Sequence, residues 1–158
     1  MSNLTLCDFR IDLLDELVAM WRQSFEDGVG ITDSHPLQQQ RDYSLSEVLP
    51  KHTVKMAMQD GLLVGFVAAS SDSVAQLYVR VGHFRKSIGF QLLDWAKSQS
   101  GESLWLYTFA RNQRARLFYE RHGFRAVAFG FEKTRQLDDV RYEWHQSSHE
   151  PVVEPAQP

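Results

Sequence analysis

An apolar stretch near the middle of the chain limits most strongly what this sequence can fold into. Residues 62–69 are nearly all apolar, and the stretch is far shorter than the ~20 residues that a membrane-spanning helix needs. A short continuous apolar run is typical of a β-strand buried on both faces. Just before it, the apolar residues Val54, Met56 and Met58 alternate with Thr53, Lys55 and Ala57. The Asp60-Gly61 pair that follows offers the positive φ angles of a tight turn. We therefore predict a hairpin whose second strand lies inside a sheet covered on both faces.

The rest of the chain adds strands and helices in a regular order. Further strands are predicted at residues 4–9, 74–79, 104–109, 124–131 and 139–144. Helices are predicted from residue 11 to an end at Gly28, from 37 to 49, from an N-cap at Ser87 to an end at Gly101, and from Asn112 to an end at Gly123. This order, βα(α)βββ-α-β-α-ββ, predicts an α/β (α+β) fold with a mixed central sheet of about seven strands, flanked by helices on both faces.

Composition limits the size and the class of the protein. With 158 residues the chain suits one domain, which we expect to span residues 1–145, and the proline-containing end at 146–158 predicts a disordered tail. The 17 basic and 20 acidic side chains give a net charge of −3, which argues against general nucleic-acid binding. Cys7 is the single cysteine and the histidines lack paired ligand spacing, so neither a disulfide nor a metal site is expected. Because the chain does not begin with a basic and then an apolar segment, we expect a cytoplasmic protein with no membrane association.

A cluster of positive charge lies between a predicted strand and a predicted helix. Arg80, His83, Arg85 and Lys86 fall within a few positions, directly before the helix that begins at Ser87. A helix N-terminus presents unpaired N–H groups and a partial positive charge, so it binds phosphate well. The segment predicts a ligand with phosphates, such as a nucleotide or CoA, and a solvated basic loop is the other interpretation. Neither Gly-Lys-Ser/Thr nor Gly-x-Gly-x-x-Gly occurs, which excludes a Walker A loop and a dinucleotide fingerprint.

Two segments resemble signatures of the GNAT N-acetyltransferases. Residues 84–89 resemble the motif with which this family binds pyrophosphate. Residues 112–124 are similar to its Asn-x-x-Ala-x-x-Phe-Tyr-x-x-x-Gly-Phe helix, which is the more specific of the two. The resemblance covers roughly residues 53–144. It implies the GNAT fold, with a CoA cleft between the strands at 74–79 and 104–109.

The resemblance implies an enzyme that moves an acetyl group from acetyl-CoA to a primary amine by direct attack of the amine on the thioester. Tyr119 is implied as the acid that protonates the departing CoA sulfur. Phe84 and Ser87 stand where the family motif has a polar residue and a glycine, which leaves the preferred acyl group open. The implied acetyl-CoA contacts are the backbone of Tyr78, Val79 and Val81, the segment Phe84, Arg85, Lys86, Ser87, Ile88, Gly89 and Phe90, and the side chains of Asn112 and Tyr119.

The sequence defines the acceptor side less closely. Gln76 stands where many members of the resembled family carry a glutamate base, and a glutamine cannot take a proton at neutral pH. Asp33, His35 and His83 are the remaining candidates for substrate contact or for a base, and residues 28–43 are expected to cover the substrate side. A small amine is the favoured substrate. An enzyme for peptide amines, a non-catalytic acyl-CoA sensor and a homodimer stay open.

Overall fold

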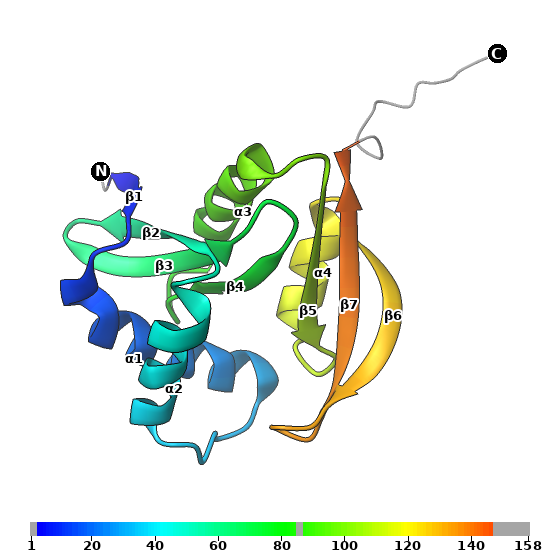
Figure 1. Ribbon diagram of the computed structural model, residues 1–158, viewed down its shortest axis with the longest axis horizontal. Coiled ribbons are helices and arrows are strands. Elements are labelled where there is room, and N and C mark those ends of the chain that lie inside the picture. The colour runs from blue at the N-terminus through cyan, green and yellow to red at the C-terminus, as the bar shows by residue number, and fades with distance from the viewer. Residues whose placement is uncertain (1–2, 85–86, 147–158) are drawn as a thin grey trace.

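The computed structural model describes residues 3–84 and 87–146 of the protein. Within them lie seven strands: β1 (Leu4–Asp8), β2 (Thr53–Gln59), β3 (Leu62–Ala69), β4 (Val74–Val79), β5 (Ser103–Phe109), β6 (Arg125–Glu132) and β7 (Leu137–His145). They form two antiparallel sheets, ordered β1-β2-β3-β4 and β5-β7-β6 (Figure 1). All seven agree with the predicted strands. The predicted single sheet is divided, because within the described residues β4 and β5 pair only at an isolated parallel bridge between Ser73 and Trp105.

The same residues contain four α-helices: α1 (Leu14–Val29), entered through a 3-10 turn (Ile11–Leu13), α2 (Leu37–Tyr43), continued by a π-helical turn (Ser44–Val48), α3 (Ile88–Gln99) and α4 (Gln113–Arg121). In Figure 1, α1 and α2 lie below the β1-β2-β3-β4 sheet and α3 lies above it, while α4 packs beside the second sheet. The prediction of helices on both faces is confirmed.

The strand β3 is buried from both sides, as its apolar sequence predicted. Leu63 and Phe66 face a core that is shared with α1, whereas Val64 and Val67 face a second core that is shared with α3 and the β5-β7-β6 sheet. All four side chains are almost completely buried. Burial of apolar surface therefore holds β3 between two helical layers. Its neighbour β4 is the last strand of this sheet, on the side that faces β5.

The first and third helices end at other residues than the sequence indicated. Gly30 is the C-cap of α1, with a φ of +80° in the left-handed region that glycine adopts freely. Gly28, the predicted end, lies inside α1 at a point where the chain before α4 comes close. A Cβ atom on Gly28 would lie 2.6 Å from the Nδ2 atom of Asn112. The C-cap of α3 is Ser100, whose backbone is extended, one position before the predicted Gly101.

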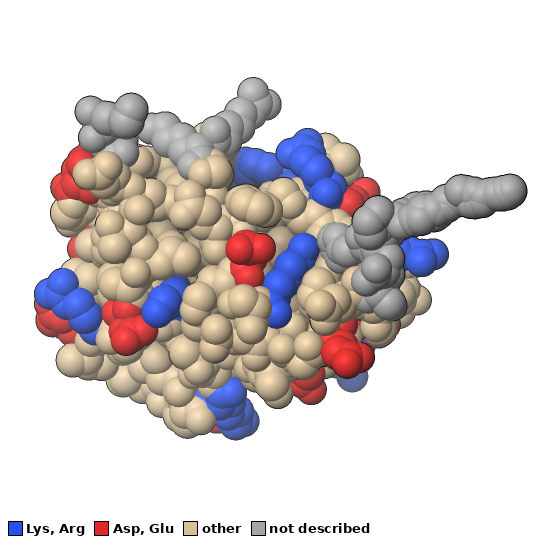
Figure 2. Space-filling model, turned by 90° about the horizontal axis from the view of Figure 1, so that it is seen from above, with Lys and Arg blue, Asp and Glu red and all other residues tan. Residues whose placement is uncertain are grey.

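The surface of the molecule carries charges of both signs. On the face seen in Figure 2, Lys and Arg side chains are interspersed with Asp and Glu side chains. None of the helices in the described part of the chain is long and apolar enough to cross a membrane. Cys7 is a free thiol. The domain span of 1–145 and the tail at 146–158 stay predictions, since residues 147–158 lie outside the described residues.

Candidate active site

A cavity of about 1180 Å³ opens where β4 and β5 separate. Single drug-sized ligands occupy sites of roughly 300–1,000 Å³, so this volume suits an elongated cofactor together with a second ligand. One end, called here the α3 end, is formed by Phe84, by Ser87 to Phe90 and by side chains of α4. The other, called here the α1 end, is formed by side chains of α1, α2, the loop between them and the turn between β6 and β7.

The α3 end presents free backbone amides. Within the described residues no partner accepts a hydrogen bond from the N–H of Ile88, Gly89 or Phe90, and the next amide is the first that bonds inside the helix, to the carbonyl oxygen of Ser87 at 3.0 Å. Gly89 lets this turn lie against α4, because a Cβ atom there would lie 3.2 Å from two ring atoms of Phe118. A helix start with unpaired amides favours an anionic ligand.

Ser87 begins α3 without capping it. Its φ is +62°, in the left-handed region where a residue with a side chain is strained. Its hydroxyl makes no hydrogen bond to a helix amide and instead accepts one from the Nε2 atom of Gln91 at 3.1 Å. The position of the predicted N-cap is therefore right, but the capping bond is absent, because the left-handed backbone directs the hydroxyl elsewhere. The helix amides stay available to a ligand.

Positive side chains of α4 lie beside this turn. The guanidinium carbon of Arg114 lies 3.9 Å from the centroid of the Phe84 ring. Arg114 and Arg121 both line the cavity. The predicted cations Arg85 and Lys86 lie outside the described residues. The cations that the structure places at the α3 end thus come from α4, from which the sequence predicted only the acetyl-CoA contacts of Asn112 and Tyr119.

Tyr119 forms part of the cavity wall on α4 and is only 6% exposed. The rings of Phe118, Phe124 and Tyr142 surround it, with centroids 5.3, 5.6 and 6.1 Å away. Burial, with a smaller effect from the phenol of Tyr78, raises the pKa of Tyr119 well above its ordinary value. Its hydroxyl is therefore protonated at neutral pH, and within the described residues no hydrogen bond holds it. It is a proton donor without a fixed partner.

Asn112 holds the start of α4. Its Oδ1 atom accepts a hydrogen bond from the backbone N–H of Ala115 at 3.1 Å, so it is the N-cap of the helix. The side chain is buried and also lines the cavity. Its Nδ2 atom makes no hydrogen bond within the described residues. Capping of α4 and the predicted contact of Asn112 with acetyl-CoA are therefore compatible.

Two of the three residues whose backbone was predicted to contact acetyl-CoA line the cavity. Gln76, Tyr78 and Val79 line the cavity, whereas Val81 does not. The carbonyl oxygen of Val79 accepts a hydrogen bond from the hydroxyl of Ser24 at 2.9 Å. One of its two lone pairs is therefore already used by the protein.

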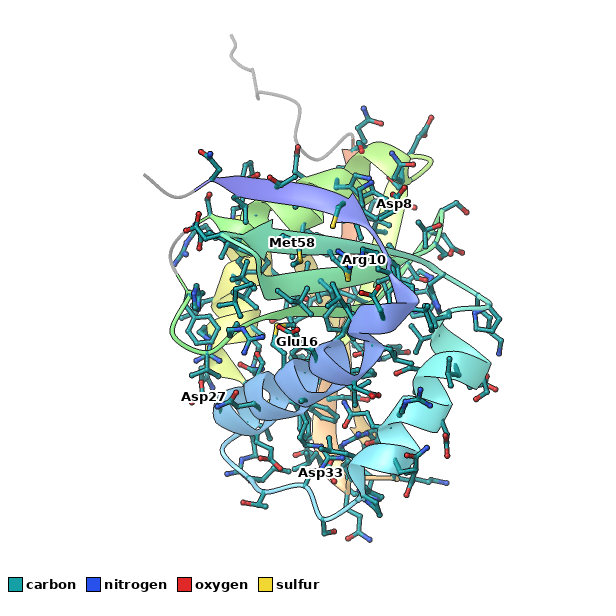
Figure 3. All side chains as sticks on the ribbon, turned by 90° about the vertical axis from the view of Figure 1, so that its left-hand side faces the viewer. Asp8, Arg10, Glu16, Asp27, Asp33 and Met58 are labelled. Atoms are coloured by element: carbon teal, nitrogen blue, oxygen red, sulfur yellow. The ribbon has the colours of Figure 1, made fainter. Side chains whose placement is uncertain are left out.

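At the α1 end, a buried carboxylate orders several side chains. The side chain of Asp33, 3% exposed, lies in the loop between α1 and α2 (Figure 3). Its Oδ1 atom accepts a hydrogen bond from the backbone N–H of His35 at 3.0 Å and lies 2.6 Å from the ring Nδ1 atom of the same residue. Its Oδ2 atom accepts from the Nε atom of Arg135 at 3.3 Å and lies 3.7 Å from the Nε atom of Arg22. Burial acts to raise the pKa of Asp33, but the bonds from His35 and the two guanidinium charges outweigh it, so the pKa lies below its ordinary value and the carboxylate is ionised at neutral pH.

The cavity thus brings together most of the residues that the sequence singled out. Of the predicted acceptor-side residues, Gln76, His35 and His83 line it, and Asp33 lies behind His35. The aromatic and polar side chains of Trp21, Arg22, Phe25, Gln39, Gln40, Tyr43, Thr134 and Arg135 complete the α1 end.

Sequence reasoning missed several of these side chains. Ser24 falls on the buried stripe of α1 and Arg22 lies at its border, and a polar residue on such a stripe is a signal that could have been read from the helical spacing. Glu132, Arg135 and Asp139 come from the ends of β6 and β7 and the turn between them. Nothing in the local sequence distinguishes them from solvated charges, because only the tertiary fold brings them to the cavity.

The sequence matches one family of known domains. Residues 50–126 match the family model described as an acetyltransferase (GNAT) domain. No curated protein matches the sequence.

Solved structures share the fold over most of the chain. YjaB from Escherichia coli, solved in its apo form, is 20% identical, with a TM-score of 0.74 over 90% of this chain and 97% of its own. The PaiA N-acetyltransferase from Thermoplasma acidophilum, in complex with coenzyme A, is 19% identical, with a TM-score of 0.71 over 90% and 99%. YncA from Salmonella typhimurium, with its cofactor acetyl-CoA, is 13% identical, with a TM-score of 0.67 over 98% and 99%. The family model and the shared fold agree: residues 50–126 match a GNAT acetyltransferase domain, and the chain has the fold of these structures over most of its length.

Proposed function

We propose that the protein transfers an acetyl group from acetyl-CoA to the primary amine of a small molecule, by direct attack of the amine on the thioester. The observation that carries the proposal is one cavity that joins the free amides at the start of α3 to the buried phenol of Tyr119. Acetyl-CoA as the cosubstrate is supported by the two related structures solved with coenzyme A or acetyl-CoA.

The α3 end fits the diphosphate of CoA. The amides of Ile88, Gly89 and Phe90 would donate to phosphate oxygens, assisted by the partial positive charge of the helix start. Arg114 and Arg121 would add charge from α4. The acyl arm would then run along β4 toward Tyr119.

Tyr119 is the proton donor in this proposal. The amine nitrogen forms a bond to the thioester carbon, the carbon–sulfur bond breaks, and the CoA thiolate takes the proton of the Tyr119 hydroxyl. The burial that raises the pKa of Tyr119 also raises the basicity of a thiolate expelled against the same apolar wall. The phenol therefore keeps its proton until the thiolate forms.

A small amine is favoured over a peptide by a contact between two segments at the α1 end. Asp33, from the loop between α1 and α2, is bonded to Arg135, from the turn between β6 and β7. The Arg135 guanidinium carbon also lies 5.0 Å from the ring centroid of Phe25 on α1. Two surface segments are thereby joined across the mouth of the acceptor site, where an extended peptide would have to lie.

The assay is the release of CoA thiol from acetyl-CoA in the presence of a panel of primary amines. We expect transfer to at least one amine, and Tyr119→Phe should lower kcat about 100-fold, the order expected for loss of a general acid, with the dissociation constant for acetyl-CoA unchanged. Tyr142→Phe is the matched control, because its ring lies beside Tyr119 but its hydroxyl bonds to Glu120 at 2.6 Å. It should lower stability and leave kcat unchanged.

Two results would contradict this function. Equal losses of kcat and of acetyl-CoA affinity in Tyr119→Phe would indicate that the residue only packs. Stabilisation of the fold by acetyl-CoA, without transfer to any amine of the panel, would instead favour an acyl-CoA sensor.

We also propose a homodimer and a cytoplasmic location, which other parts of the molecule support. β6 is an edge strand on which Val127, Phe129 and Phe131 are exposed. A second copy that covers this strand would bury its apolar side chains and pair its free edge, which supports a homodimer. The location that we propose is the cytoplasm, since a chain with a single cysteine forms no intrachain disulfide and needs no oxidising compartment to fold.

A further inference from the structure

We propose that His35 is the general base that takes the proton from the acceptor ammonium, and that Asp33 is the residue that positions it. This role rests on the proposed transferase activity and supplies the group which that activity still lacks. An ammonium has no lone pair, so the amine must lose a proton before it can attack the thioester. Gln76 lines the cavity, but its amide cannot take that proton.

The contact between Asp33 and His35 determines how the imidazole can act. The Oδ1 atom of Asp33 lies 2.6 Å from the Nδ1 atom of His35. Because the ionised carboxylate can only accept a hydrogen bond, Nδ1 must carry the hydrogen. A neutral imidazole holds one ring proton, so the Nε2 atom keeps its lone pair. His35 lines the cavity with a side chain that is 33% exposed, and within the described residues no hydrogen bond occupies Nε2.

Three described histidines line the cavity, and of these His35 alone has a carboxylate partner. The Nδ1 atom of His83 is buried and has no hydrogen-bond partner among the residues that the structure describes. Burial, followed by the nearby positive charges, lowers the pKa of His122 and so disfavours its protonated form. An imidazole that accepts a proton becomes a cation, and only at His35 does an adjacent anion stabilise that cation.

Asp33 is held in place from several elements. Arg22 of α1 and Arg135 of the turn between β6 and β7 face its Oδ2 atom, and the carboxylate of Glu26 accepts a hydrogen bond from its backbone N–H at 2.7 Å. Figure 3 shows Asp33 in the loop between α1 and α2. These contacts fix the position of the carboxylate, which in turn fixes the orientation of the His35 ring.

The proton balance of the reaction is then complete. The ammonium gives its first proton to Nε2 of His35, and the free amine attacks the thioester carbon. The carbon–nitrogen bond forms, the carbon–sulfur bond breaks, and Tyr119 protonates the thiolate. The nitrogen loses its second proton when the amide forms, and solvent carries a proton back to the Tyr119 hydroxyl. His35 releases the proton that it accepted to bulk water. An ammonium and acetyl-CoA thus give an amide, free CoA and one proton.

The test is the pH dependence of kcat/KM for the amine in His35→Gln, measured from pH 6 to 10. The probes are benzylamine, putrescine and lysine methyl ester, and the fastest of them with the wild type is used for every variant. We expect His35→Gln to be about 100-fold slower at pH 7, as for loss of a general base. The defect should shrink as the pH approaches the pKa of an alkyl amine, about 10, because free amine then forms in solution. The dissociation constant for acetyl-CoA should not change.

A matched control is His52→Gln, since His52 lies outside the cavity and its Nδ1 atom bonds only to the backbone carbonyl of Val48. It should follow the wild type at every pH. If His35→Gln is slower by the same factor at every pH, His35 binds the substrate but is not the general base. If the rate of His35→Gln equals that of the wild type, His35 has no role in the reaction. Absence of transfer by the wild type to all three probes overturns the proposed function, and this base with it.

A second measurement needs no substrate. Nitrogen NMR of the histidine side chains at neutral pH should show His35 as the tautomer with hydrogen on Nδ1, and Asp33→Asn should abolish that preference while His52 keeps its own. A His35 that carries its hydrogen on Nε2 in the wild type has no lone pair toward the cavity, and this result would overturn the proposal whatever the activity of the protein.

Discussion

Gly28→Ala is predicted to destabilise the protein, although alanine is the better helix former. Gly28 lies within α1, where a Cβ atom would stand 2.6 Å from Nδ2, 3.0 Å from Cγ and 3.1 Å from Oδ1 of Asn112. Atoms this close must move. The group that has to move is the amide of Asn112, which caps α4 through its bond to the N–H of Ala115.

The expected size of the effect follows from opposing contributions. Replacing glycine by alanine inside a helix gains about 0.8–1.0 kcal/mol. Losing an asparagine N-cap costs about 1 kcal/mol, and inserting a methyl group into a packed contact costs roughly 1–3 kcal/mol. Gly28→Ala should therefore lower the free energy of unfolding by about 1–3 kcal/mol.

Urea unfolding of a double-mutant cycle measures this directly. In an Asn112→Ser background the shorter side chain can still cap α4 but leaves room for the methyl group, so Gly28→Ala should there become neutral or stabilising. Gln23→Ala, at an exposed position of the same helix, is the control and should change stability little. If Gly28→Ala alone raises stability by the ~1 kcal/mol of helix propensity, α1 and the start of α4 are not in contact as described.

Three further predictions concern other parts of the molecule. Ser87→Gly should raise the free energy of unfolding by about 0.5–1 kcal/mol, measured in urea, because glycine removes the left-handed strain at φ +62°; a loss would contradict that strain. Asp33 has a lowered pKa when folded, so it contributes stability above its ordinary pKa of 3.8 that is lost as the pH falls through the folded value. Asp33→Asn should flatten the acid limb of stability against pH, and an unchanged limb would argue against the ion pairs. Phe129, 69% exposed on β6, should contribute to a dimer interface, so Phe129→Asp should give a monomer by analytical ultracentrifugation, with unchanged thermal stability of the monomer; a monomeric wild type would contradict this.

Much of the fold could be read from the sequence because it depends on local periodicity. The strand at residues 62–69 is apolar throughout because it contacts helices on both faces, and each predicted strand was found. The division of the sheet could not be read in the same way. The separation of β4 and β5 is a property of the tertiary fold, and nothing in the sequence of residues 74–79 or 103–109 marks these strands as unpaired.

The missed features of the site depend on contacts between distant segments. Gly28 and Gly30 are both plausible helix ends in the sequence, and only the approach of Asn112 to Gly28 shows why one of them lies inside the helix. Asp33 and Arg135 are 102 positions apart, and no local pattern pairs them. The partnership of Asp33 with His35 was within reach, since the two are close in the sequence, but the burial that makes it chemically useful is a property of the fold.

Binding of acetyl-CoA depends, in the function proposed above, on the first amides of α3, which hold its diphosphate. Backbone amide NMR of the wild type, titrated in parallel with acetyl-CoA and with pantetheine, tests it most directly. We expect acetyl-CoA to shift the signals of Ile88, Gly89 and Phe90 more than those elsewhere in α3, and pantetheine, which lacks the diphosphate, to leave them in place. Signals of these three residues that stay in place at saturating acetyl-CoA would contradict the claim.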